Sequence, residues 1–179
     1  MSFWLAVSLS ASGLWGAILM CSRPGRGPWP PRQGNWPTAI WAWGLTVAIY
    51  VGLVRAGSAD WNALDWPAWL RWGIGGIALS VAATWVQGRA IFDLGLKGTS
   101  GWDTGLVSDG AYAHRRHPQY LAQIVSLAGL AILLASPDAM IAALAGASAL
   151  FYASVIEDRD LAGKHPEAFA RYVERVGFF

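Results

Sequence analysis

Long stretches with few or no charged residues alternate with short polar ones, and this alternation predicts membrane-spanning helices. Residues 3–21 carry no charge at all. As an α-helix they would extend about 28 Å, close to the thickness of the hydrocarbon core of a bilayer. We expect further spans on the same grounds, at residues 38–54, 68–92, 118–136 and 139–156.

The last two spans are joined only by Pro137 and Asp138, and a link this short predicts an antiparallel helical hairpin. Beyond the acidic residues that follow the hairpin, Gly163 can end one helix and Pro166 can begin another. The residues that would form an apolar stripe on this C-terminal helix are Leu161, Phe169, Tyr172 and Val176. Such a helix suits the surface of the bilayer or of the bundle.

The sequence therefore predicts an all-α integral membrane protein with about five transmembrane helices, a C-terminal helical hairpin and an interfacial amphipathic C-terminal helix. We expect a single membrane domain. Its first part, 1–92, holds three N-terminal helices, and its second part, 93–179, holds a long glycine-rich loop, the hairpin and the tail.

Composition supports the membrane assignment, because 55% of the residues are hydrophobic and 13% are charged, whereas soluble domains carry roughly a quarter charged residues. A net charge of +2 without a basic, aromatic-rich run argues against a nucleic-acid partner. The single cysteine, Cys21, excludes internal disulfides and Cys-x-x-Cys motifs. A cleaved signal peptide is the competing interpretation of residues 3–21, but no basic residue precedes them and they lack a convincing small-residue cleavage site.

Two further patterns concern the arrangement in the membrane. Within residues 68–92, small side chains recur at helical spacing at Gly73, Gly76, Ser80 and Ala83, which predicts close contact with another helix. Lys and Arg are concentrated in residues 22–37, 89–117 and the tail, which fall on one side if the chain crosses five times. Since basic loops stay in the cytoplasm, we expect the N-terminus outside and a bacterial-type inner-membrane location.

The candidate chemistry lies in the stretch G-A-Y-A-H-R-R-H-P-Q-Y, residues 110–120. His117, Tyr120 and Gln123 are three residues apart and would form one polar edge on a helix. The hairpin would bring this edge to Glu157 and Asp158. Polar groups that face the interior of a membrane bundle indicate a functional site by default.

Structural explanations exist for the same residues. Arg115 and Arg116 can determine topology, His117 can bond a carbonyl group, and Tyr120 can anchor the interface. The acids can be solvated, although carboxylates near a helix C-terminus oppose the helix dipole and so favour a partner, either Arg116 or a cationic ligand. A metal site formed by the three histidines (His114, His117 and His165) lacks a His-x-x-x-His pair or cysteines, and we predict none.

The pattern G-x-Y-x-x-x-R-H-P-x-Y before an apolar hairpin and two adjacent acids resembles the isoprenylcysteine carboxyl methyltransferase and phospholipid methyltransferase superfamily. The matching positions are Gly110, Tyr112, Arg116, His117, Pro118 and Tyr120. Glu157 and Asp158 stand at an acidic pair that is usually two glutamates. The resemblance covers roughly residues 93–179 and implies S-adenosylmethionine-dependent methylation of a membrane-embedded amphiphile.

The residues that we expect to bind this cofactor are Tyr112, Arg116, His117, Tyr120, Gln123, Glu157 and Asp158. For a carboxylate acceptor, Arg175 or Arg171 would orient the substrate. For an amine acceptor, Glu167 or Glu157 would accept the proton. Cofactor and active site would face the cytoplasm, and the lipid-like acceptor would come from the bilayer.

Two other functions remain open at this point. Membrane sterol reductases share a similar C-terminal motif and use NADPH, but they are longer. A non-catalytic membrane scaffold or ligand-binding protein would keep the helices without the reaction. The sequence does not identify the acceptor, the type of methylation or the oligomeric state.

Overall fold

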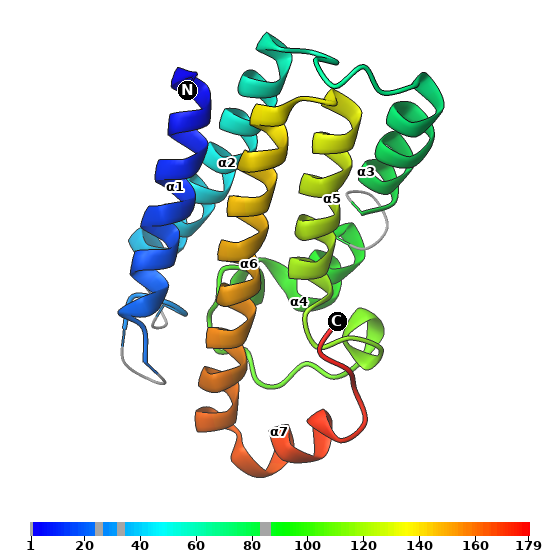
Figure 1. Cartoon of the computed structure of the whole chain (residues 1–179). Coiled ribbons are helices and arrows are strands. Elements are labelled where there is room, and N and C mark those ends of the chain that lie inside the picture. Colours follow the sequence, from blue (N-terminus) through cyan, green and yellow to red (C-terminus); the bar gives the residue numbers. More distant parts are fainter. Residues whose placement is uncertain (1, 24–26, 32–34, 83–86) are drawn as a thin grey trace.

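The computed structural model describes residues 2–23, 27–31, 35–82 and 87–179, which form a bundle of helices (Figure 1). No β-strand occurs in these ranges, so the all-α prediction is confirmed. The helices are α1 (Phe3–Met20), α2 (Trp36–Ala59), the π-helix η1 (Trp69–Gly76), α3 (Ile77–Val81), α4 (Gly88–Thr99), the 3-10 turn η3 (Gly110–Ala113), α5 (Pro118–Leu134), α6 (Pro137–Lys164) and α7 (Pro166–Val173).

Helix α6 is the central element and contacts α1, α2 and α5. Its buried face consists largely of small residues, among them Ala142, Gly146 and Ala153, which let neighbouring helices approach closely. Helices α1, α2 and α6 are long and apolar enough to cross a membrane, while α5 is apolar but shorter. The protein is thus an all-α membrane protein, and the number of crossings stays a prediction.

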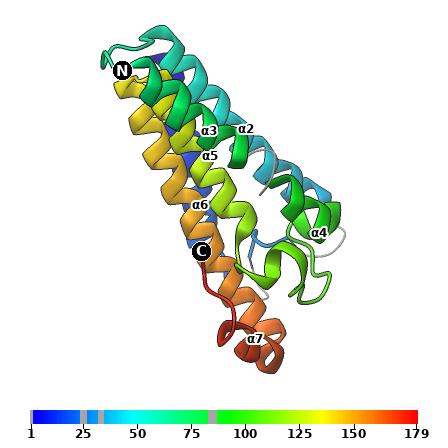
Figure 2. The same ribbon diagram turned by 90° about the vertical axis from the view of Figure 1, so that its right-hand side faces the viewer.

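The predicted hairpin is present, and α5 and α6 run antiparallel side by side (Figures 1 and 2). The turn comes two residues earlier than expected: Ala135, with a left-handed φ of 49°, and Ser136 form it, and Pro137 already begins α6. The Ser136 hydroxyl accepts the Ala139 N–H at 3.1 Å. A proline in the first turn has no N–H to leave unsatisfied, which explains the early start.

Helix ends differ from the expected span ends because a charge ends an apolar run but does not end a helix. Helix α6 continues from Ile156 to Lys164 and stops before Pro166, since a proline disfavours helical geometry in the residue before it. Glu157 and Asp158 therefore lie inside α6, two turns before its end. The residues of the predicted apolar stripe pack together, with Phe169, Tyr172 and Val176 on Leu106 and Leu161, but Leu161 lies on α6 and Val176 follows the end of α7.

The expected single helix over residues 68–92 is described only in part and stays a prediction. The chain forms η1 and α3, residues 83–86 lie outside the described residues, and α4 then runs past Phe92 to Thr99 with a break at Gly95, whose φ is 71°. A glycine tolerates this conformation and lets two short helices follow each other. The connection predicted to begin at Asp93 is therefore helical in its first residues.

The described members of the predicted small-residue stripe make no close contact within this chain, because η1 is a π-helix with a wider turn than the α-helix that the spacing assumed. Gly73 and Gly76 have open space around them and Ser80 is exposed, while Ala83 lies outside the described residues. The close contact uses Gly75 instead. A Cβ at Gly75 would lie 2.9 Å from the Gly129 carbonyl oxygen on α5.

We expect Gly129→Ala to destabilise the bundle, since a Cβ at this position would lie 2.9 Å from the Gly75 carbonyl oxygen and from the Leu79 backbone nitrogen. Overpacking of this kind costs roughly 1–3 kcal/mol. The unfolding of purified protein in detergent would measure it. Gly76→Ala is the matched control, because nothing lies within 4 Å of its Cβ position. Equal stability of the two variants would contradict the proposed packing.

Candidate active site

The motif residues and the acidic pair meet at the end of the bundle that lies opposite the α5–α6 turn (Figure 1). The imidazole Nε2 of His117 lies 2.7 Å from the Asp158 Oδ1, and the guanidinium of Arg116 pairs with the other carboxylate oxygen. His117 is only 3% exposed. Since α5 and α6 are antiparallel, the start of one faces the late turns of the other, and this juxtaposition was predicted from the hairpin.

A C-terminal strap, residues 177–179, holds the motif from the other side. The backbone N–H of Arg116 donates a hydrogen bond to the Gly177 carbonyl oxygen at 3.0 Å. The Phe178 ring lies 4.9 Å from the His117 ring and 5.1 Å from the Arg116 Cζ. Asp158 and Phe178 thus contact the same imidazole and guanidinium, Asp158 through hydrogen bonds and Phe178 through its ring.

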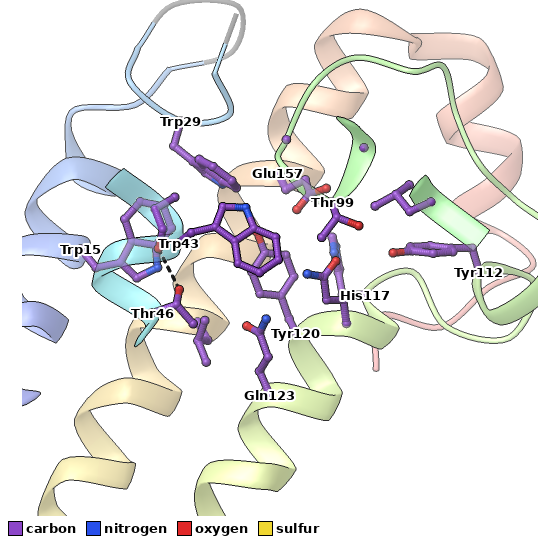
Figure 3. A pocket seen from close by; sticks show the side chains of 16 residues that line it. Trp15, Trp29, Trp43, Thr46, Thr99, Tyr112, His117, Tyr120, Gln123 and Glu157 are labelled. Carbon is purple, nitrogen blue, oxygen red and sulfur yellow. Dashed lines mark hydrogen bonds between the residues drawn. The ribbon is translucent and has the colours of Figure 1, made fainter. Parts of the chain in front are cut away.

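Two adjoining cavities of about 50 Å³ each open beside this cluster. The inner cavity, shown in Figure 3, has indole rings on the side of α1 and α2 and has Tyr112 on the opposite side. Its polar lining consists of Thr46, Thr99, Tyr112, His117, Gln119, Tyr120, Gln123 and Glu157, and its aromatic wall of Trp15, Trp29 and Trp43.

The outer cavity lies between the loop at residues 101–107 and the C-terminal turns of α6 with α7. The charged residues that line it are Asp103, Arg116, Glu157, Asp158, Asp160 and Lys164, and the aromatic ones are Trp102, Tyr112, Phe169 and Tyr172. Glu157 and Tyr112 line both cavities and therefore stand at their junction.

Several buried polar groups in these walls have no hydrogen-bond partner among the described residues. They include the Trp15 and Trp102 indole N–H groups, the Thr99 hydroxyl and the Arg116 Nε. An unsatisfied buried donor costs roughly 1–3 kcal/mol. Such groups in the walls of two adjoining cavities are placed to hydrogen-bond to water or to a ligand.

The turn that carries Tyr112 is fixed from two directions. The Asp93 carboxylate accepts the Ala111 N–H at 2.7 Å, and this hydrogen bond lowers the pKa of Asp93. Gly110 has a φ of 56°, and a side chain there would meet that carboxylate, so both conformation and space require glycine. The Tyr172 hydroxyl donates to the Tyr112 carbonyl oxygen at 2.6 Å, and burial raises the pKa of Tyr172 to about 12.

The structure brings together all the residues expected to bind the cofactor. Those that line the inner cavity are Tyr112, His117, Tyr120, Gln123 and Glu157, and Arg116 with Asp158 lines the outer one. The residues expected to act in catalysis are placed differently: Glu167, Arg171 and Arg175 are exposed and line neither cavity. The roles of both groups stay predictions.

Sequence reasoning missed the wall supplied by the N-terminal part, above all Trp15, Trp29 and Trp43. The indole rings of Trp15 and Trp29 are buried, with exposed fractions of 3% and 6%, whereas Trp43 is 38% exposed. The spacing of tryptophans along separate helices does not reveal which of them meet in space. It also missed Thr99 and Trp102, which lie in the region predicted to be a loop.

Comparison with known proteins agrees with this geometry. The sequence model for phospholipid methyltransferases matches residues 72–166, which include the RHPxY motif, the hairpin and the acidic pair. The chain belongs to the phospholipid methyltransferase family. Membership indicates a membrane methyltransferase type of protein and leaves the acceptor open.

One curated relative is the cobalt-zinc-cadmium resistance protein CzcN of Cupriavidus metallidurans. It is 32% identical to this family member over 142 residues, which cover 78% of the present chain and 62% of the relative. The chain thus spans less than two thirds of that protein's length. Within the described ranges no three His, Cys, Asp or Glu side chains are grouped to hold a metal ion. No solved structure shows a significant match.

We expect Phe178→Ala to loosen the motif, because it removes the ring that contacts both His117 and Arg116. Aromatic and cation–π contacts contribute about 0.5–1.5 kcal/mol each, so ligand affinity should fall about tenfold. Isothermal calorimetry with S-adenosylhomocysteine would measure the change. Phe179→Ala is the control, since the Phe179 ring packs on Phe151 and Phe178. Equal losses in both variants would assign the effect to the strap as a whole.

Proposed function

We propose that this protein is an S-adenosylmethionine-dependent methyltransferase that acts on a membrane-embedded or amphiphilic acceptor. The observation that carries the proposal is the junction of the two cavities at Glu157, beside the buried Arg116–Asp158–His117 cluster, in a member of the phospholipid methyltransferase family. Methyl transfer requires two ligands to meet in line, and adjoining cavities suit that requirement.

The chemistry of the walls fits the cofactor, which supplies a methyl group on a sulfonium together with an ammonium, a carboxylate and an adenine. The unsatisfied Arg116 Nε can donate a hydrogen bond to the carboxylate of the cofactor. Glu157 can accept hydrogen bonds from its ammonium or from a ribose hydroxyl. The aromatic residues of the outer cavity, Trp102, Phe169 and Tyr172, offer faces for a flat base. His117 stays oriented because Asp158 and Phe178 hold its ring.

Each cavity holds only about 50 Å³, whereas ligand sites usually measure roughly 300–1,000 Å³. Binding therefore requires a wall to move outward. The loop at residues 101–107 suits this movement, because Gly101 and Gly105 have positive φ values of 80° and 86° and can absorb a hinge rotation.

An amine-type acceptor is favoured over a carboxylate-type one. In the inner cavity the acceptor would meet the Glu157 carboxylate and indole faces, which attract a cation and repel an anion. Glu157 is also placed to accept a proton from an amine. Arg171 and Arg175, which would serve a carboxylate acceptor, are exposed.

The site's position in the cell is part of the proposal. The N-terminal Ser2 donates to Asp138 at 2.8 Å, at the α5–α6 turn, so the N-terminus and the candidate site are at opposite ends of the bundle. With the basic segments on the cytoplasmic side, the site faces the cytoplasm of a multi-pass inner-membrane protein.

The test combines binding and transfer. Calorimetry of the detergent-purified protein with S-adenosylhomocysteine should give saturable binding, while NADPH should give none. Labelled methyl groups should then pass from S-adenosylmethionine into a total lipid extract. Saturable NADPH binding without S-adenosylhomocysteine binding would favour a reductase. Absence of both would favour a non-catalytic membrane protein.

A further inference from the structure

A further hollow, which is apolar, adjoins the inner cavity on the side away from the outer cavity. This apolar hollow has a volume of about 300 Å³, lies between α1 and α2, and includes Leu14, Ile18, Pro28, Thr38 and Trp41 in its lining. All of these are hydrophobic except the threonine. It precedes residue 72, where the family match begins, so nothing in the family match defines it.

The hollow and the inner cavity share two wall residues, Trp15 and Ala42. Both are buried, at 3% and 5% exposure. A tryptophan from α1 and an alanine from α2 therefore form the boundary between an apolar space and a polar one. A molecule that reached from one to the other would need an apolar part and a polar part.

The outer rim of the hollow belongs to the face of the bundle that would meet lipid. Leu14 is 48% and Trp41 is 64% exposed, and both lie on helices long and apolar enough to cross a membrane. An apolar chain can therefore enter sideways from the hydrocarbon region without crossing water. The indole of Trp15 adds a buried N–H without a partner at the boundary.

We propose that the hollow between α1 and α2 holds the apolar chain of the methyl acceptor, with its polar head in the inner cavity past Trp15 and Ala42. This inference rests on the proposed function. It makes the acceptor a single-chain amphiphile, and it makes the N-terminal helices the part of the protein that selects chain length. Because the chain would come from bilayer hydrocarbon and not from water, the fit of the chain to the hollow would select its length.

The probe is octadecylamine that carries a diazirine in its chain, added to the full-length protein in phosphatidylglycerol nanodiscs. After irradiation, mass spectrometry should find the label within residues 14–18 and 38–42, and excess unlabelled octadecylamine should remove it. Thr38→Trp, which fills the hollow, should reduce the competed label at least fivefold. Ile40→Trp is the control, since Ile40 is 66% exposed and does not line the hollow.

Calorimetry with S-adenosylhomocysteine on the same samples separates the two proposals. One outcome is that S-adenosylhomocysteine binds, while the label is spread evenly over exposed residues such as Met20 and Val47 and is not removed by competition. Contact with the bulk bilayer would explain such labelling. This result would overturn the acceptor-chain site in the hollow and leave the methyl-donor assignment standing. Competed labelling in the hollow without S-adenosylhomocysteine binding would overturn the methyl-donor assignment and retain a lipid-binding site. Equal labelling of the Thr38→Trp and Ile40→Trp variants would also overturn the acceptor-chain site in the hollow.

Discussion

Asp158→Asn is expected to abolish S-adenosylhomocysteine binding and to lower the stability of the bundle. Its carboxylate is the shared partner of the Arg116 guanidinium and the His117 imidazole, and the side chains of these residues are 13% and 3% exposed. A neutral amide leaves the guanidinium without a counter-charge in a largely buried place. Truncating or neutralising one partner of such a pair costs roughly 2–5 kcal/mol, so affinity should fall at least 100-fold.

The measurement is a pair of experiments on the same preparation, calorimetric titration and detergent unfolding. Asp138→Asn serves as the control, because Asp138 also makes a side-chain hydrogen bond, to Ser2 at 2.8 Å, but at the opposite end of the bundle. That variant should bind S-adenosylhomocysteine normally. Normal binding by Asp158→Asn would mean that the cluster is not part of the donor site.

The sequence was sufficient for features that depend on neighbouring stretches. The short link at Pro137 and Asp138 predicts the hairpin, and the hairpin in turn places His117 beside Asp158. The three-residue spacing of His117, Tyr120 and Gln123 then predicts one face, which lines the inner cavity. These inferences succeed because link length and helix periodicity are both local properties of the chain.

Features that depend on distant contacts or unusual helices were not predictable in this way. The π-helix η1 changes which glycine faces α5, so that Gly75 takes the place expected for Gly73 and Gly76. Phe178 reaches His117 only because the chain turns back after α7. The inner cavity is lined by tryptophans that lie far apart in the sequence, and tertiary packing decides which tryptophans meet there.

Glu157→Gln should have the second large effect, on turnover rather than on folding. The substitution keeps the size of the side chain and its capacity to hydrogen-bond, and it removes the one carboxylate that lines both cavities among the described residues. If Glu157 accepts a proton from an amine acceptor, its loss should lower kcat by about 10²–10⁴-fold. The loss of its contact with the cofactor ammonium should weaken S-adenosylhomocysteine binding as well.

Labelled-methyl transfer into lipid extract, measured at saturating cofactor, isolates the effect on turnover. Glu167→Gln is the informative comparison, because Glu167 is the other acid predicted to serve as a base, yet it is exposed at the start of α7. Loss of transfer in Glu157→Gln with retention in Glu167→Gln would assign the proton acceptor to the cavity junction. The reverse result would require α7 to fold over the site during turnover, and would move the reacting groups from the junction to the tail.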